Sequence, residues 1–263
     1  MSPDESSLHP KVDILVPVRA PAPWFTEALE SVVRQDYPNW RLIVVMDGYA
    51  QEIEQSCHNL QISDRLILEE MPAGTGLVGA LNRGLAVSDA SYLARLDADD
   101  VCRSDRLSKQ VAYMQNNPEC VVVGGQVQRV SEAGEPLGPP SRSGARPVMK
   151  TLRWRCPIAH PTAMIRSRYA RQVGGYRPEA LHAEDFDLWL RMGATGTIDV
   201  ISDVVLDYRV HTGQVTAGLR FPSTTLEAIK DSRLQLAQAR NESLLSARIR
   251  QRAWVSVNRW RGR

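Results

Sequence analysis

Apolar segments of two kinds alternate along the N-terminal part of the chain, and this alternation constrains the fold more than any other feature. The runs 12–18, 40–46, 65–68 and 92–96 are rich in Val, Ile and Leu, which is typical of buried strands, and the stretches between them carry apolar residues at helical spacing. Strands that alternate with helices predict a mostly parallel, doubly wound α/β sheet flanked by helices. Such sheets bind ligands outside the carboxyl ends of their strands, so the residues that follow each run are candidate site residues.

The same periodicities predict the remaining elements. Residues 134–147 hold four prolines and three glycines and are expected to form an extended loop. Helices are expected at 24–35, 51–60, 77–87, 104–116 (capped by Ser104) and 183–192, a strand or hairpin at 121–130, and a strand at 204–210.

The run 92–96 is followed directly by Asp97-Ala98-Asp99-Asp100, which places three carboxylates at the carboxyl end of a strand. Hard oxygen ligands at this spacing suit a Mg or Mn ion that bridges two phosphates. The alternative is an acidic turn that only caps the next helix. Taken alone, the four residues leave both interpretations open.

Composition excludes several classes of protein. With 263 residues and 43% apolar content, the chain can bury a full core, so it is neither disordered nor fibrous. No segment approaches the roughly 20 apolar residues that cross a bilayer, and the polar start is not a signal peptide, so a cytoplasmic protein is expected. The four cysteines lack CxxC spacing, which favours free thiols.

Charge is distributed unevenly. Residues 223–263 carry nine Lys or Arg against three acids, whereas the rest of the chain carries 23 basic and 27 acidic residues. An acidic body argues against nucleic-acid binding. We therefore divide the chain into a catalytic domain at 11–222 and a basic amphipathic helical tail at 223–263.

The tail carries an apolar stripe within residues 245–260, with arginines around it. The stripe fits a peripheral helix on anionic lipid, a dimer contact, or a helix that packs on the body. Its members are Leu245, Ile249, Ala253, Val257 and Trp260.

Five stretches, in order, resemble the family 2 glycosyltransferases. The resemblance covers roughly residues 11–215 and implies a GT-A fold around a nucleotide-sugar site. The stretches are Ile14 to Val18, Tyr37 to Gly48, Gly79 to Leu85, Leu96 to Asp100 with Asp105-Arg106-Leu107, and Val173-Gly174-Gly175-Tyr176 leading to Glu184-Asp185.

The resemblance implies a donor-nucleotide site at Pro17, Asp47, Asn82 and Asp97. Asp47 matches the residue that accepts a hydrogen bond from uracil, which favours a UDP-sugar or a dTDP-sugar, and Asp97 would lie near the ribose. Relatives often have Pro-x-Tyr-Asn after the first strand and a basic residue before the Asn. This chain has Pro17-Val-Arg-Ala and Leu81-Asn82, so its base-side wall and phosphate contacts differ.

The resemblance also assigns a divalent metal, Mn or Mg, to Asp99 and to His211, with Asp100 in support. A divalent ion stabilises the negative charge that the nucleoside diphosphate gains as the glycosidic bond breaks.

Asp185 matches the catalytic base of the family, and Glu184 would orient it or bind the acceptor. Acids in the first turn of a helix also complement the helix dipole, and the two roles are compatible. The remaining residues of the expected acceptor and sugar pocket are His160, Gly174, Gly175 and Tyr176.

Two other interpretations compete with this one. Asp97 to Val101 satisfies the DxDx(T/V) signature of haloacid-dehalogenase-type phosphatases, in which Asp97 would be the nucleophile, but the motif follows the fourth expected strand, whereas that class has it after the first. A catalytically silent nucleotide-binding module would lack a base or a metal ligand, and this chain has both. We expect a metal-dependent inverting glycosyltransferase that moves a sugar to a glycan or lipid-linked acceptor in surface-polysaccharide assembly.

Overall fold

The computed structural model describes residues 9–20, 23–141, 147–214 and 221–260, with side chains as far as Val257. Within these ranges one eight-stranded sheet has the order β3-β2-β1-β4-β7-β6-β8-β5. Its strands are β1 (Val12–Val18), β2 (Trp40–Met46), β3 (Leu66–Glu70), β4 (Tyr92–Arg95), β5 (Val101–Cys102), β6 (Cys120–Val130), β7 (Met164–Arg166) and β8 (Thr197–Arg209).

The first half of the sheet is parallel, as expected. β1 pairs in parallel with β2 and β4, and β2 pairs in parallel with β3. β1, β2 and β4 are buried on both faces, which explains why their sequences are nearly continuous apolar runs.

The second half is mixed. β7 is antiparallel to both of its neighbours, β4 and β6, and β5 is antiparallel to β8. β6 and β8 run parallel to each other with register shifts beside Gly124 and Gln126, so 121–130 is one irregular strand and no hairpin. The sheet is therefore mostly parallel, with β7 and β5 reversed.

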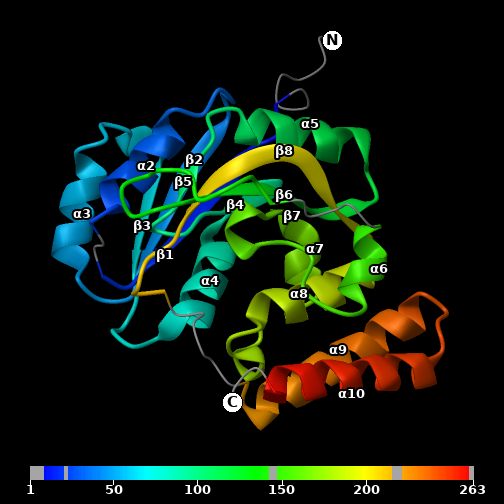
Figure 1. Cartoon of the computed structure of the whole chain (residues 1–263). Coiled ribbons are helices and arrows are strands. Elements are labelled where there is room, and N and C mark those ends of the chain that lie inside the picture. The colour runs from blue at the N-terminus through cyan, green and yellow to red at the C-terminus, as the bar shows by residue number, and fades with distance from the viewer. Residues whose placement is uncertain (1–8, 21–22, 142–146, 215–220, 261–263) are drawn as a thin grey trace.

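Helices cover both faces of this sheet (Figure 1). α2, α3 and α5 pack on one face, and α4, α6, α7, α8 and α9 pack on the other. The bounds are α2 (Phe25–Val33), α3 (Ala50–His58), α4 (Gly76–Val87), α5 (Arg106–Asn116), α6 (Val148–Leu152), α7 (Ser167–Gln172), α8 (Glu184–Gly193), α9 (Ser223–Ala239) and α10 (Leu244–Trp260).

One capping prediction differs from the structure. Ser104 does not cap α5: the N-cap position is Asp105, whose side chain makes no capping hydrogen bond, and the Ser104 carbonyl accepts the Asp36 amide instead (2.9 Å). In the proline-rich loop, the described part up to Ser141 runs along β6, because Leu137 and Ser141 donate their amides to β6 carbonyls (both 2.8 Å). Residues 142–146 of that loop lie outside the described residues.

The tail is helical, and it forms two helices. α9 and α10 are separated at Asn241, which adopts a left-handed conformation with φ of 52°. α9 packs against α8 and buries Ile229 and Leu236 in the same core as Trp189. In the part of the chain that the structure describes, no helix has both the length and the apolar content needed to cross a membrane.

Candidate active site

The carboxyl ends of the parallel strands meet at one edge of the sheet. Asp47, directly after β2, donates its amide to the carbonyl of Val18 at the end of β1 (2.8 Å). The acidic turn follows β4, which is the other neighbour of β1, and His211 follows β8. The topology therefore brings the predicted acids and the predicted histidine to one place.

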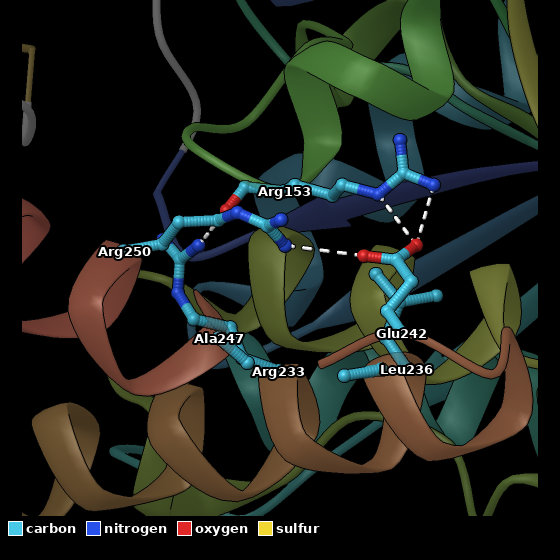
Figure 2. Close-up of a pocket in the computed structure, with 7 residues that line it drawn as sticks. Arg153, Arg233, Leu236, Glu242, Ala247 and Arg250 are labelled. Atoms are coloured by element: carbon cyan, nitrogen blue, oxygen red, sulfur yellow. Dashed lines mark hydrogen bonds and ion pairs between the residues drawn. The ribbon is translucent and has the colours of Figure 1, made fainter. Parts of the chain in front are cut away.

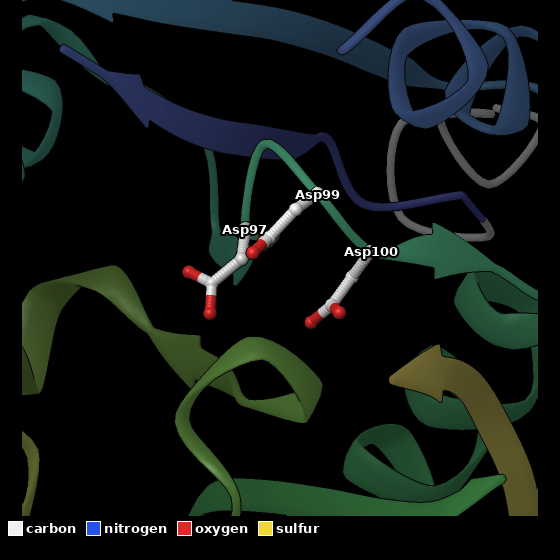
Figure 3. Close-up of side chains that lie close together, drawn as sticks. All are labelled: Asp97, Asp99 and Asp100. Atoms are coloured by element: carbon white, nitrogen blue, oxygen red, sulfur yellow. The ribbon is translucent and has the colours of Figure 1, made fainter. Parts of the chain in front are cut away.

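Asp97, Asp99 and Asp100 extend from one turn, and their carboxylates lie within 4.8 Å of one another (Figure 3). His211 Nε2 lies 2.7 Å from Asp99 Oδ2. The Gly213 amide donates to His211 Nδ1 at 3.1 Å, so in the neutral ring Nε2 carries the proton and donates it to Asp99. The structure therefore brings Asp99 and His211, the two residues assigned to the metal, into contact, and the metal assignment itself stays a prediction.

Asp100 is 1% exposed and has one incompletely satisfied oxygen. Its Oδ1 accepts the amide of Arg209 at 2.9 Å, whereas no described residue bonds to Oδ2. Burial raises the pKa of Asp100 well above its ordinary value, and the charges of Asp97 and Asp99 raise it further. A divalent cation among these hard oxygens would favour the ionised carboxylates, so the donor set fits Mg or Mn.

Arg209 and Trp24 support this cluster, and neither was predicted from the sequence. Arg209 donates to the Asp99 carbonyl (3.0 Å) and pairs with Glu27 (2.6 Å). The Arg209 guanidinium lies 5.4 Å from the centre of the Trp24 ring, which in turn packs on the His211 ring at 4.8 Å. The aromatic ring and the arginine thus fix the position of the histidine.

Asp47 caps the helix that opens toward the site. Its Oδ1 and Oδ2 accept the amides of Thr75 (2.9 Å) and Gly76 (3.0 Å) at the N-terminus of α4. Each carboxylate oxygen retains a second lone pair, so the predicted contact with a nucleobase stays a prediction. Pro17 lies beside it near the end of β1, where it pairs in register with Val45.

Asn82 and Tyr176 make two reciprocal hydrogen bonds. Asn82 Oδ1 accepts the Tyr176 amide, and Asn82 Nδ2 donates to the Tyr176 carbonyl, both at 2.8 Å. Gly174 and Gly175 precede Tyr176 with φ of 85° and 68°, and a Cβ on Gly175 would lie 2.6 Å from Asn82 Oδ1. Asn82 therefore holds the glycine turn; its predicted contact with the donor is a separate, untested role.

His160 and Tyr176, two residues of the expected acceptor and sugar pocket, contact each other next to this turn. His160 Nε2 and the Tyr176 hydroxyl are 3.1 Å apart, and the His160 ring meets the edge of the Trp189 ring with centroids 5.9 Å apart. Burial, assisted by the charge of Arg95, lowers the pKa of His160 well below its ordinary value. The imidazole is therefore neutral at pH 7.

Asp185 lies in the first turn of α8. Its Oδ1 accepts the Phe186 amide at 2.6 Å, and Cys156 Sγ lies 3.5 Å from Oδ2. Burial raises the pKa of Asp185 to about 7, with a further contribution from the charge of Glu184. Burial also raises the pKa of Glu184. A carboxylate whose pKa lies near 7 is suited to take a proton from a hydroxyl.

Arg95 connects the two halves of the site and was not singled out from the sequence. It is buried at the end of β4 and forms an ion pair with Asp97. Burial raises the pKa values of Glu184 and Tyr176 and lowers that of His160; the positive charge of Arg95 offsets part of the two rises and adds to the fall. The signal that could have identified it is an arginine within the apolar run 92–96.

Comparison with solved structures confirms the expected GT-A fold. The structure of Staphylococcus aureus TarS (residues 1–349) in complex with UDP-GlcNAc superposes with a TM-score of 0.74 at 16% identity and covers 93% of this chain and 71% of that one. The mannosyltransferase PcManGT from Pyrobaculum calidifontis, in complex with GDP-Man and Mn²⁺, gives a TM-score of 0.63 at 18% identity and covers 96% and 85%.

Sequence comparison identifies the family. A glycosyltransferase of uncharacterised function from Haemophilus influenzae is 31% identical over 196 residues, which is 72% of each chain. The O-antigen biosynthesis glycosyltransferase WbnJ from Escherichia coli is 30% identical over 189 residues, covering 70% of this chain and 73% of that one. The model of glycosyl transferase family 2 matches residues 13–174. The chain therefore belongs to glycosyl transferase family 2, as its motifs indicate.

Proposed function

We propose that this protein is a metal-dependent, inverting glycosyltransferase that moves a sugar from a UDP- or dTDP-sugar to a hydroxyl of a glycan or lipid-linked acceptor. The observation that carries the proposal is the presence of two groups of carboxylates: the acidic turn after β4, whose Asp97 pairs with Arg95, and Glu184 with Asp185, whose pKa is about 7. The relative WbnJ is named for O-antigen biosynthesis, which supports a role in surface-polysaccharide assembly. Four free thiols agree with a reducing cytoplasm.

Inversion requires a single displacement at the anomeric carbon. Asp185 takes the proton of the acceptor hydroxyl while the acceptor oxygen forms a bond to that carbon. The bond from the anomeric carbon to the phosphate oxygen breaks, and its electron pair leaves with the nucleoside diphosphate. Tyr176 and His160, held by Asn82 and Trp189, line the pocket for the sugar and the acceptor.

Asp99, Asp100 and His211 are the residues that would hold Mn or Mg. The unpartnered oxygen of Asp100 supports this assignment. To bind the ion, His211 would have to exchange its hydrogen bond to Asp99 for the metal, because its Nε2 carries the proton and its Nδ1 accepts the Gly213 amide. The ion would supply positive charge at the diphosphate as it departs. Arg95 forms an ion pair with Asp97, the residue predicted to lie near the ribose.

We assign to Asp47 the hydrogen bond that selects the nucleobase of the donor. Its free lone pairs can accept the imide N–H of uracil or thymine, whereas guanine presents a different set of edge groups. The two solved neighbours bind UDP-GlcNAc and GDP-Man, so the base has to be tested directly.

A thermal-shift comparison of UDP, dTDP, GDP, CMP and a simple phosphate ester, each with and without Mn²⁺, tests the proposal. We expect UDP or dTDP with Mn²⁺ to raise the melting temperature most, because a ligand that binds only the folded state stabilises it. Asp99→Asn should lose the Mn²⁺-dependent part of the shift. Asp105→Asn, a half-exposed aspartate paired with Lys109, is the matched control and should keep it.

An unchanged shift in Asp99→Asn would show that the assigned metal site is wrong. The family match gives no support to the phosphatase alternative. That alternative would be restored if Asp97 became covalently phosphorylated by a phosphate ester.

A further inference from the structure

The inner face of α10 packs against the body of the protein. Ala247 and Gln251 are buried, and Gln251 donates to the Leu226 carbonyl on α9 at 2.8 Å. Trp254 stacks on Phe221 with ring centroids 5.2 Å apart and meets Phe186 at 5.9 Å. Phe186 follows Asp185 in α8, so the inner face of α10 is one aromatic contact away from the proposed base.

Ion pairs hold the start of α10 in the same position (Figure 2). Glu242, in the turn between α9 and α10, accepts Arg153 Nε at 2.6 Å and pairs with Arg250 at 3.1 Å. Arg233 lies beneath them and donates to the carbonyls of Arg153 and Trp154. These contacts hold the start of α10 against the body of the protein.

The outer face of α10 carries exposed apolar side chains. Leu245, Ile249 and Val257 are 68%, 55% and 52% exposed, and Ala253 is exposed between them. They recur every four residues and form one stripe opposite the buried Gln251. Of the ten large apolar side chains that are exposed in the described residues, four lie on α10, with Leu244 as the fourth. Trp260, the last predicted member of the stripe, has a side chain outside the described residues.

Positive charge flanks this stripe. Arg248 and Arg252 are exposed, and at about 100° per residue they lie within one third of a turn of Leu245. α10 contains no Asp or Glu, so nothing on the helix neutralises them. An apolar stripe beside unneutralised arginines is the pattern of a helix that lies in the interface of an anionic bilayer.

We propose that the outer face of α10, defined by Leu245, Arg248, Ile249, Arg252 and Val257, docks on a lipid surface that carries anionic phosphate headgroups. The apolar stripe would enter the boundary between headgroups and acyl chains, and the arginines would contact the phosphates. Because the inner face touches Phe186, such docking brings the bilayer close to the first turn of α8. The proposal rests on α10 alone and does not require the proposed function.

The positive charge on the outer face of α10 favours a bilayer, and not a second copy of the chain, as the partner of this face. A two-fold contact through this face would place Arg248 and Arg252 beside the same residues of the partner, with no acid on α10 to offset the repulsion. The acidic body could attract the arginines of another copy, but that contact is not self-complementary and would generate rings or open filaments in place of a dimer. An anionic bilayer complements both the stripe and the arginines.

Vesicle flotation of the full chain tests the proposal. We expect binding to vesicles of phosphatidylcholine and phosphatidylglycerol in equal parts, little binding to phosphatidylcholine alone, and weaker binding at high salt. The paired substitutions Leu245→Ser with Ile249→Ser, and Arg248→Gln with Arg252→Gln, should each weaken binding by about tenfold or more.

A matched control has an exposed valine next to an exposed arginine on α2. Val33→Ser with Arg34→Gln changes a residue that is 40% exposed and its charged neighbour, and it should bind vesicles like the unchanged chain. Circular dichroism should give the same melting temperature for all three variants within a few degrees.

Three results would overturn the proposal. The first is equal binding of anionic and neutral vesicles, and the second is unchanged binding in both α10 variants. The third is a dimer, seen by sedimentation, that the same substitutions dissociate while vesicles remain unbound; this result would assign the face to a second copy. Transfer to a water-soluble acceptor should be unchanged in both variants, so the outcome is distinct from a failure of the proposed transferase.

Discussion

The raised pKa of Asp185 predicts how the rate depends on pH. The proposed base must be ionised to take a proton, and its pKa is about 7, so kcat/KM should rise with pH through about 7 and level off above it. Asp185→Asn should lower turnover by about 10²- to 10⁴-fold and abolish this rise. Initial rates of sugar transfer between pH 5 and pH 9 provide the measurement. A rise centred at an unperturbed aspartate pKa would contradict the assignment.

The same residue predicts a pH dependence of stability with a defined sign. The pKa of Asp185 is raised from 3.8 to about 7 in the folded protein, so between these values the folded state holds a proton that the unfolded state has released. The contribution of Asp185 to the free energy of unfolding therefore falls as pH rises through this window and is constant above it. We compare the free energy of unfolding of Asp185→Asn with that of the unchanged protein at pH 4 and at pH 7, by urea denaturation. The difference should shift in favour of Asp185→Asn as the pH rises from 4 to 7. An equal difference at both pH values would contradict the raised pKa.

Substitution of two adjacent glycines distinguishes the effect of backbone strain from the effect of a steric clash. Gly174 and Gly175 both have positive φ, but only at Gly175 would a Cβ meet the Asn82 side chain, at 2.6 Å. Gly174→Ala should cost about 1 kcal/mol of unfolding free energy, and Gly175→Ala should cost about 1 to 3 kcal/mol and lower the transfer rate as well. Chemical denaturation and initial rates measure the two effects, and equal losses in both variants would show that the Asn82 contact is unimportant.

At the scale of elements, Asp187 joins α8 to α9 and to the glycine turn. It is fully buried and accepts hydrogen bonds from Arg177 (3.0 Å), Arg191 (2.8 Å) and Ser232 on α9 (2.7 Å). Arg191 in turn donates to the Gly175 carbonyl at 2.7 Å. Asp187→Ala would leave two arginines without their carboxylate, which should cost about 3 to 5 kcal/mol of unfolding free energy.

The control for Asp187 is an exposed ion pair in the same region. Glu227 pairs with Lys230 on the surface of α9, and Glu227→Ala should change the free energy of unfolding by no more than about 1 kcal/mol. Urea denaturation of both variants at pH 7 decides the comparison. Similar small losses would mean that Asp187 does not hold α9 in place.

The elements that the sequence predicts well are those whose own periodicity defines them. β1, β2 and β4 are apolar runs with buried partners on both sides, and α2 and α4 have buried stripes at helical spacing. β5 and β7 have two and three residues, too few for a period to show, and they form because distant strands pair with them. The break between α9 and α10 also has no Gly or Pro, since Asn241 supplies the left-handed turn.

At the scale of the whole molecule, the location of the site was predictable and its supporting contacts were not. Parallel strands place the residues after β2 and β4 at one edge, which follows from the order of elements alone, whereas His211 after β8 was expected there only from the family resemblance. Two of these contacts, from Asn82 to Tyr176 and from Trp24 to His211, depend on side-chain packing between distant segments. The third, from Arg95 to Asp97, depends on the burial of one arginine in an apolar strand. A pattern along the chain carries no information on such pairs.

Packing of the two tail helices predicts that they contribute unequally to folding. α9 buries Ile229 and Leu236 in the core beneath the sheet and supplies Ser232 to Asp187, whereas α10 buries little beyond Ala247 and Gln251. A chain that ends at Asn241, which lacks α10, should fold with a lower melting temperature. A chain that ends at Pro222 lacks both helices, exposes the core and leaves Arg177 without two of its partners on α9, so it should not fold cooperatively.

Calorimetry and far-UV circular dichroism distinguish these outcomes. The full chain should unfold in a single transition in which the calorimetric and van't Hoff enthalpies agree, because α8 and α9 share one core with the sheet. Two separate transitions, or a chain ending at Pro222 that unfolds as cooperatively as the full chain, would show that 11–222 is an independent domain and that α9 is only an appendage. A single transition that persists in the chain ending at Asn241 and is lost in the shorter one would place the boundary of the cooperative fold after α9, so that α10 could serve as a docking surface without being needed for the core.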